Sequence, residues 1–308
     1  MAGPLAGIRV LDLTSVVSGP LSTMFLADQG AEVIKIEPLG GDITRHSRQS
    51  ISASGEFSAL FVSTNRGKRS LALDLKRPEA AKIMRKLIAS ADVLVQNFRP
   101  GTMERLGLGE PTLRAFHPRL IYVSISGVGE SGPYAGKRVY DPIIQGLSGF
   151  ADVQADPETR RPRMIRTIVA DKTTAIFAAQ AVTAALFARE RTGLGQHIRL
   201  AMLDTMIAYL WPEAMTQYTV VGREASTADP TARPELIFAT RRLHHRRYHL
   251  RFRVARLLRC LGTSGSRRGS EVQHPRWPGG QRHRADSADG GDHQATPDRG
   301  LAATARHE

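Results

Sequence analysis

The chain has 308 residues, of which 41% are hydrophobic, and a formal net charge of +14. This length allows one or two folded domains, and the hydrophobic fraction is typical of a globular protein. No basic segment precedes the first apolar stretch, and the longest apolar run, residues 175–188, is shorter than the ~20 residues that span a bilayer. Cys260 is the only cysteine, which excludes an intrachain disulfide and a zinc site built from several cysteines. We therefore expect a cytoplasmic protein with no metal site.

The positive charge is concentrated in the C-terminal part of the sequence. Residues 241–308 contain 15 Arg, no Lys and six acidic residues, and so carry nine of the fourteen net charges. The later half of this tail is rich in Gly, Arg and Asp and has no apolar period, which predicts disorder.

Three interpretations of the tail compete. A nucleic-acid arm would bind phosphates by counterion release, but such arms usually mix Lys with Arg. The histidines at 244, 245 and 249 suggest metal binding, but the surrounding arginines would repel a cation. Out-of-frame translation of a GC-rich gene produces this Arg-, Gly-, Ala-, His- and Pro-rich composition, and we favour it.

The first forty residues predict a β–α–β unit. Residues 7–15 form a short β-rich run after Gly, and residues 31–38 form another. Between them, residues 18–30 fit a helix with Ser18 as a candidate N-cap. Such a unit implies parallel strands joined by a right-handed crossover.

The same order of elements continues along the chain. We expect strands at 70–75, 92–98 and 120–127, a helix from Pro78 to Ser90, a buried Ala-rich helix at 173–190, and a further strand and helix within 191–211. The predicted fold class is α/β: a Rossmann-like parallel sheet in a large domain (1–200), the start of an incomplete small domain (201–240), and the basic tail (241–308). In such folds ligands bind at the carboxyl ends of the strands.

A dinucleotide site is disfavoured. Glu37 ends the second predicted strand, where a Rossmann enzyme holds the ribose, but the turn after the first strand reads TSVVSGP. The glycines of a G-x-G-x-x-G motif, which let the backbone approach a pyrophosphate, are missing.

Asp171 interrupts an apolar run, RTIVADKTTAIFAAQ, immediately before the predicted long helix. Local pattern favours an N-cap, because Asp is a preferred capping residue and Thr173 and Thr174 lie where its oxygen would reach backbone donors. The alternative is a nucleophilic carboxylate, which is ionised at neutral pH and needs no general base.

Several long segments resemble the class III CoA-transferase family, the CaiB–BaiF and formyl-CoA transferase type, which also includes α-methylacyl-CoA racemases. They are PLAGIRVLDLTSVVSGP, LADQGAEVIKIEPLGGDITR, NRGKRSLALDLKRPEA, ADVLVQNFRPGTMERLGL, YDPIIQGLSG and GLGQHIRLAMLD. They occur in the family's order over about residues 4–240.

The resemblance implies that Asp171 is the catalytic aspartate. In this family the carboxylate attacks an acyl-CoA to form a mixed anhydride, and CoA then forms an aspartyl-CoA thioester. CoA or acyl-CoA is thus a substrate, a carboxylic acid is the second substrate, and no cofactor is permanently bound. The family's CoA-binding positions correspond here to Val17, Ser18, Leu73, Asp74, Leu75, Lys76, Asn97, Phe98, Arg99, Arg105 and Arg138. Arg and Lys suit phosphates, and Phe98 is a candidate for stacking on adenine.

Two further expectations follow from the resemblance. The racemases carry a catalytic His where this chain has Tyr140, and a phenol is a poor base at neutral pH, so CoA transfer is favoured over a racemase-like reaction. Family members are longer and form interlocked homodimers, and they complete a small domain where this sequence changes character. The alternative function is therefore an inactive remnant whose tail binds polyanions without specificity; neither specific nucleic-acid binding nor membrane binding is expected.

Overall fold

The computed structural model describes residues 2–47, 57–156, 158–215 and 219. The expectations for the tail at 241–308, and for residues 220–240, lie outside the described residues. The described part belongs to one compact unit, residues 1–235.

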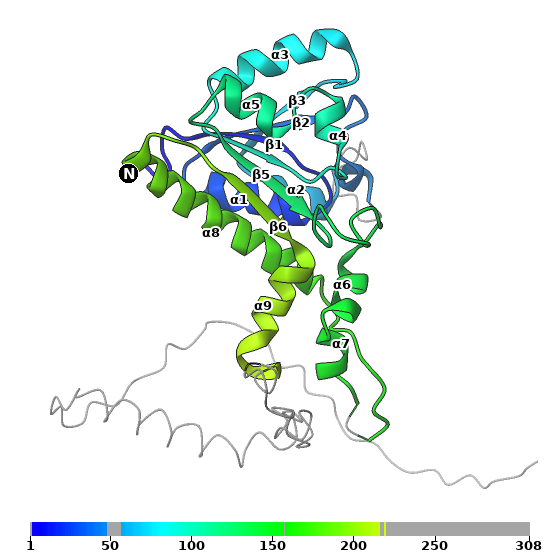
Figure 1. Cartoon of the computed structure of the whole chain (residues 1–308). Coiled ribbons are helices and arrows are strands. Elements are labelled where there is room, and N and C mark those ends of the chain that lie inside the picture. The colour runs from blue at the N-terminus through cyan, green and yellow to red at the C-terminus, as the bar shows by residue number, and fades with distance from the viewer. Residues whose placement is uncertain (1, 48–56, 157, 216–218, 220–308) are drawn as a thin grey trace, which may run out of the picture. The chain divides into compact units, whose positions relative to one another are not determined.

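A six-stranded parallel sheet forms the centre of this unit (Figure 1). The strands are arranged in the order β3-β2-β1-β4-β5-β6. They comprise β1 (Arg9–Leu13), β2 (Glu32–Glu37), β3 (Lys68–Ala72), β4 (Val93–Gln96), β5 (Ile121–Ser126) and β6 (His197–Ala201). The central strands are nearly continuous apolar runs because helices cover both faces of the sheet.

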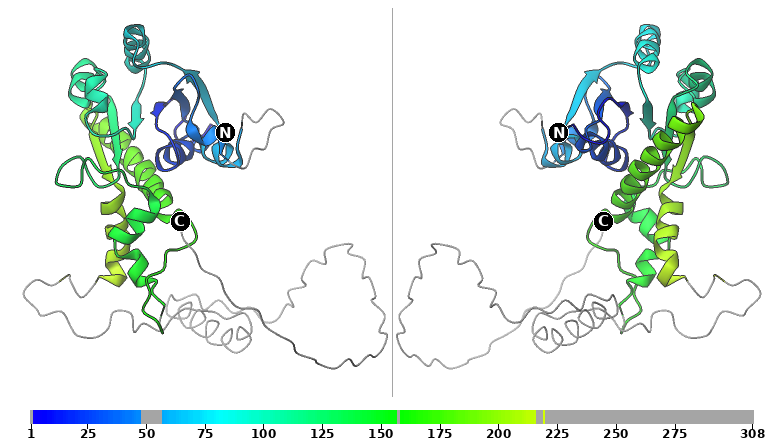
Figure 2. Two further views of the ribbon diagram at one scale, coloured as in Figure 1. Left: turned by 90° about the vertical axis from the view of Figure 1, so that its right-hand side faces the viewer. Right: turned by 90° about the vertical axis from the view of Figure 1, so that its left-hand side faces the viewer.

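Two layers of helices cover the sheet, as Figures 1 and 2 show. One layer contains α1 (Ser18–Asp28) and α8 (Val169–Thr192), whose small and apolar side chains join those of β1, β4 and β5 in one core cluster. The other contains α3 (Pro78–Ala89), α4 (Thr102–Arg105) and α5 (Glu110–Phe116), which enclose a second cluster. The remaining short elements of this part are η1 (Ile43–His46) and α2 (Ala59–Asn65).

Three helices lie beyond the sheet. They are α6 (Asp141–Leu147), α7 (Phe150–Val153) and α9 (Met202–Ala214), which follows β6 directly. A third apolar cluster, which includes Ile144, Phe150 and Met206, joins them to the first turn of α8. This cluster fixes the start of α8 relative to the loop that leads into α6.

The predicted α/β fold class and strand-helix alternation are confirmed, with four local corrections. The third strand is 68–72 and not 70–75, so Leu73 follows it. Val17, and not Ser18, is the N-cap of α1, which has no side-chain cap. The long helix begins at Val169, so Asp171 lies inside its first turn and is not its N-cap. The sequence analysis also missed six short elements: η1, α2, α4, α5, α6 and α7.

The expectation that the long helix is buried all round is also wrong. Ala178, Val182 and Ala185 face the core, whereas Ile176 is 57% exposed and Phe187 64% exposed. Among the described residues, none of the helices combines the length and apolarity needed to cross a bilayer, and no group of three or more His, Cys, Asp or Glu is placed to hold a metal.

Candidate active site

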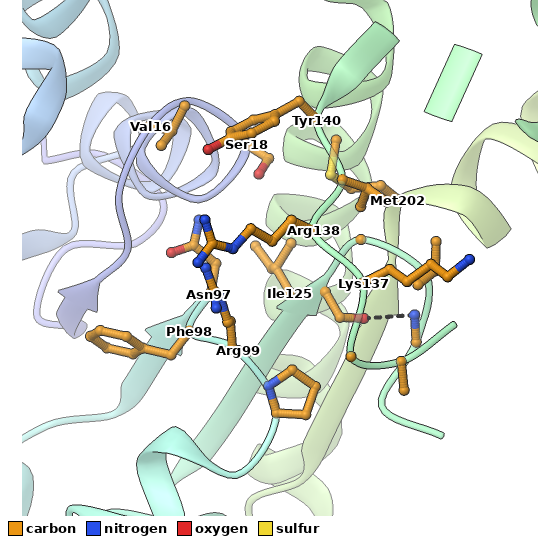
Figure 3. Close-up of a pocket in the computed structure, with 18 of the residues that line it drawn as sticks. Val16, Ser18, Asn97, Phe98, Arg99, Ile125, Lys137, Arg138, Tyr140 and Met202 are labelled. Carbon is orange, nitrogen blue, oxygen red and sulfur yellow. Dashed lines mark hydrogen bonds between the residues drawn. The ribbon is translucent and has the colours of Figure 1, made fainter. Parts of the chain in front are cut away.

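A pocket of about 290 Å³ lies at the carboxyl ends of β1, β4 and β5. Between β1 and β4 the strand order reverses, and this topological switch point is where open parallel sheets bind ligands. The lining comes from the loops after β1, β4 and β5, from the segment before α6, and from the first turn of α8. Figure 3 shows Val16, Ser18 and Tyr140 on one side of the pocket and Asn97, Phe98 and Arg99 on the other.

The pocket brings together six of the predicted site residues. They are Ser18, Asn97, Phe98, Arg99, Arg138 and Asp171. The other six do not line it: Val17 is a buried residue of the β1–α1 loop, Leu73, Asp74, Leu75 and Lys76 follow β3, and Arg105 lies on α4.

Asp171 is the sole carboxylate among the described residues that line the pocket. Burial removes water from this group, and the neighbouring Asp141 adds like charge, so that the pKa of Asp171 rises to about 6. The side chain and the backbone of Ser18 oppose this rise. The carboxylate is consequently about nine-tenths ionised at pH 7, and the site holds a partly dehydrated anion.

The N-terminus of α1 stabilises the ionised form of Asp171, whereas the sequence analysis assigned this role to its own helix. Ser18 is the first residue of α1, so its N–H is one of the unpaired donors at a helix start. At the start of α8, the N–H groups of Ala170 and Asp171 instead donate to the Asp141 carboxylate. The start of α8 is thus capped by a carboxylate from another element.

The loop that presents Ser18 has a strained backbone. Val16 has φ of +72°, a value that β-branched residues rarely adopt, and it lines the pocket. Asn97 holds the preceding residue by accepting from the Ser15 N–H at 3.0 Å and donating to the Ser15 carbonyl at 2.9 Å. The residue after β4 therefore ties two walls of the pocket together.

A network of buried charged side chains contacts Thr14 at the start of this loop. Asp12 accepts hydrogen bonds from the N–H and hydroxyl of Thr14, and from Lys68 Nζ at 2.8 Å. Lys35 Nζ donates to the Thr14 carbonyl at 2.7 Å and pairs with Asp42 at 3.1 Å. The four charged side chains are 2% exposed or less, so the network is rigid and fixes Thr14 two residues before Val16.

Three cations give the pocket a positive rim. Arg99, Lys137 and Arg138 line it and are exposed to solvent. In Figure 3, the side chain of Arg138 extends toward Asn97, whereas the ring of Phe98 points away from the other labelled side chains. Phe98 packs against the second core cluster, which favours a role in the core over stacking on adenine.

Glu37 is fully engaged by the protein. It accepts hydrogen bonds from Arg45, from the Ser70 hydroxyl and from the Asp42 N–H. Burial alone would raise the pKa of Glu37, but these partners lower it to about 2. The absence of a ribose-binding acid agrees with the missing glycine motif.

Sequence reasoning missed several residues that shape the site. Asp141 and Lys137 lie in the same segment as Tyr140 and Arg138, which the sequence analysis did discuss. Pro142, in the first turn of α6, is a helix-start signal that could have pointed to Asp141. Gly127 lines the pocket where a Cβ would lie 1.9 Å from Val139 Cγ2. A glycine that follows a strand offers a weak signal for such a close approach.

The fold and the pocket define a parallel α/β protein of the doubly wound class, with an ionised aspartate and a cationic rim at the switch point. The model of CoA-transferase family III matches residues 5–246, and the chain belongs to this family.

Similar proteins carry related names. The chain is 44% identical over 225 residues to succinate–glutarate CoA-transferase of Agrobacterium fabrum, covering 71% of the chain and 56% of the relative. It is 43% identical to acetyl-CoA:oxalate CoA-transferase of Acetobacter aceti, covering 72% and 56%. A CaiB/BaiF family protein from Brucella suis matches with a TM-score of 0.68 and 40% identity, over 71% of this chain and 58% of that one. The chain thus spans somewhat more than half the length of these relatives.

Proposed function

We propose that the protein transfers coenzyme A between an acyl-CoA and a carboxylic acid, with Asp171 as the nucleophile. The observation that carries this proposal is the partly buried carboxylate with a pKa of about 6 in the switch-point pocket of a family III chain. An anion that is dehydrated yet still ionised at neutral pH is a better nucleophile than a solvated one.

The proposed reaction proceeds through two enzyme-bound species. An Asp171 oxygen attacks the thioester carbonyl, the C–S bond breaks, and CoA leaves as a thiolate while a mixed anhydride remains. The thiolate attacks the Asp171 carbonyl carbon and expels the original acyl group as a free carboxylate. The acceptor acid then reverses both steps, so that atoms and charge balance without an added base or cofactor.

Residues around Asp171 have separate proposed roles. Ser18 favours the ionised form, because its hydroxyl and its backbone lower the pKa of Asp171. Arg99, Lys137 and Arg138 suit the CoA phosphates or an acid substrate because they line the pocket as exposed cations. Lys76 and Arg105 follow β3 and β4 at the same edge of the sheet, and we assign them to the part of CoA outside the pocket.

A racemase-like reaction is the runner-up. It needs a base that removes a proton next to the thioester carbonyl. The described residues that line the pocket include no histidine, and Tyr140 is 64% exposed at its entrance. These features favour CoA transfer.

The names of the relatives suggest which acids to test. They include succinate–glutarate, acetyl-CoA:oxalate and succinyl-CoA:mesaconate CoA-transferases. The cationic rim suits a second carboxylate, so we propose dicarboxylic acids as the substrate class.

Trapping of the intermediate tests the proposal. The full chain is incubated with succinyl-CoA or acetyl-CoA, treated with hydroxylamine or borohydride, and digested for mass spectrometry. A modified peptide containing Asp171 is expected, together with its absence in Asp171→Asn. Transfer of CoA to glutarate, oxalate or mesaconate by Asp171→Asn at the wild-type rate would refute the nucleophile.

A second copy of the chain is the proposed protein partner. Ile176 and Phe187 on α8 are more than half exposed, as is Tyr209 on α9. Exposed large apolar side chains of this kind favour an interaction surface. Light scattering coupled to size-exclusion chromatography would measure the mass, and a monomer at all concentrations would contradict this partner.

A further inference from the structure

Asp141 is a buried carboxylate with an unusual set of partners. Its side chain is 2% exposed and lies in the first turn of α6. One oxygen, Oδ2, accepts from the Ala170 N–H at 2.6 Å and from the Asp171 N–H at 3.1 Å. The other oxygen accepts from Gln145 Nε2 at 2.6 Å. One of these donors is the backbone N–H of Asp171, and the others lie within six residues of Asp141 or Asp171 along the chain.

The start of α8 needs this carboxylate because its own sequence supplies no cap. The N-cap residue is Ile168, which has no polar side chain. An N-cap hydrogen bond contributes about 1 kcal/mol to helix stability, and its loss leaves N–H groups unpaired. Asp141 fills this role from another helix, some thirty residues earlier in the chain.

Gln145 fixes the orientation of Asp141. Its amide also donates to the Thr167 carbonyl at 3.2 Å and accepts from the Ile165 N–H at 3.0 Å. One turn of α6 therefore holds both the carboxylate and the segment that leads into α8. The Asp141 carboxylate therefore cannot rotate freely. The backbone of Asp171 is fixed by its own N–H, which donates to Asp141, and by the preceding segment, which Gln145 holds.

We propose that Asp141 is a positioning residue for the reaction: its side chain caps α8 from α6 and thereby fixes the direction in which the Asp171 carboxylate projects. This inference rests on Asp171 as the nucleophile. Attack on a thioester requires reacting atoms about 3–3.5 Å apart and aligned, and a displacement of about 1 Å can cost a hundredfold in rate.

The same placement adds like charge beside the nucleophile. Asp171 faces Asp141 from α6 and Ser18 from α1, and the cations of the pocket rim, Arg99, Lys137 and Arg138, lie on the loops around it. Its neighbour Lys172 on α8 donates to the Thr167 hydroxyl. Asp141 therefore has a second effect, since it keeps the Asp171 pKa high.

The experiment compares Asp141→Ala, Asp141→Asn and the control Asp152→Ala in the full chain. Asp152 is an exposed aspartate in the first turn of α7 and has no place in the pocket. Steady-state kinetics gives kcat and KM, and amide hydrogen exchange with mass spectrometry compares peptides from residues 169–173 with peptides from residues 178–188.

Asp141→Ala is expected to lower kcat about a hundredfold with little change in the KM for acyl-CoA. Exchange should quicken at 169–173 and stay unchanged at 178–188. Asp141→Asn keeps a capping oxygen, so kcat should stay within about tenfold of wild type, while the acidic limb of its pH profile moves to lower pH. The control should match wild type in every measurement.

Wild-type kcat in Asp141→Ala, or unchanged exchange at 169–173 in both variants, would overturn the positioning role. If Asp141→Ala does not fold, Asp141→Asn decides: an unmoved pH profile together with unchanged exchange overturns it. Asp171→Asn separates the two proposals. Activity in that variant refutes the nucleophile, whereas an inactive Asp171→Asn beside a fully active Asp141→Ala refutes only the inference about Asp141.

Discussion

Ser18 and Asp171 join the starts of two helices that pack against each other. The hydroxyl and the backbone of Ser18 both lower the pKa of the Asp171 carboxylate. Since Ser18 opens α1, the carboxylate occupies the position of an anion at a helix N-terminus. The pair therefore determines how much of the aspartate is ionised at a given pH.

Removal of the Ser18 hydroxyl should raise the pKa of Asp171, because this hydroxyl lowers that pKa in the folded protein. For Ser18→Ala we expect the acidic limb of the kcat/KM profile, near pH 6 in the wild type, to move up by at most about one unit. The measurement is the pH–rate profile between about pH 5 and 8. Ser22→Ala is the control, because Ser22 is buried in α1 and donates to the Gly19 carbonyl. An unmoved limb in Ser18→Ala would contradict the role of the hydroxyl.

Asp171 is expected to lower the stability of the protein at neutral pH. Its folded-state pKa of about 6 exceeds the unperturbed value of 3.8, so the folded state binds protons more tightly than the unfolded state. Stability therefore falls as pH rises from about 4 to 6, and the loss is complete above that range. Asp171→Asn should add about 1–2 kcal/mol at about pH 7.5, allowing for partial exposure, and less at about pH 5.

Thermal and urea unfolding at the two pH values would measure this gain. Asp152→Asn is the matched control, because Asp152 is also a first-turn aspartate but is exposed. It should add no stability at either pH. A gain in Asp171→Asn that is equal at the two pH values would be inconsistent with a raised pKa.

Disruption of the buried ion network should be costly. Lys68→Met leaves Asp12 as an uncompensated charge in a site where both side chains are 2% exposed or less, and we expect a loss of about 3–5 kcal/mol. The exposed pair of Arg66 and Asp28 provides the control, and Arg66→Met should cost about 0–1 kcal/mol. Urea unfolding compares the two. Similar costs for both variants would show that the network is solvated.

Gly127 and Gly146 form a second matched pair. A Cβ at Gly127 would clash with Val139 in the pocket wall, so Gly127→Ala should raise the KM for acyl-CoA about tenfold. Gly146 lies in α6, where an added methyl group would meet no atom within 4 Å, and Gly146→Ala should stabilise the protein by about 0.5–1 kcal/mol. Kinetics and thermal unfolding give both values. Unchanged KM in Gly127→Ala would mean that Val139 moves without closing the pocket.

Much of the fold was predictable because the strands are short, apolar and buried on both faces. The run VLVQ and the run IYVSIS predict two strands of a parallel sheet, and the structure pairs them as the neighbours β4 and β5. Short elements such as α4 and α7, of four residues each, were missed because one helical turn carries no detectable period. Their position depends on contacts with distant residues.

By itself the sequence determined the α/β class, the order of the main strands, the absence of a glycine-rich dinucleotide loop, and Asp171 as the residue of interest. The class, the strands and the missing loop follow from local composition, because apolar periodicity and turn residues act over a few positions, whereas the interest in Asp171 came from the family resemblance. The tertiary structure alone decided which groups surround that aspartate. Ser18 reaches it because α1 packs on α8, and Asp141 caps it because α6 meets the start of α8. Burial and charge act through space, so the pKa and the direction of a carboxylate depend on neighbours that are distant along the chain.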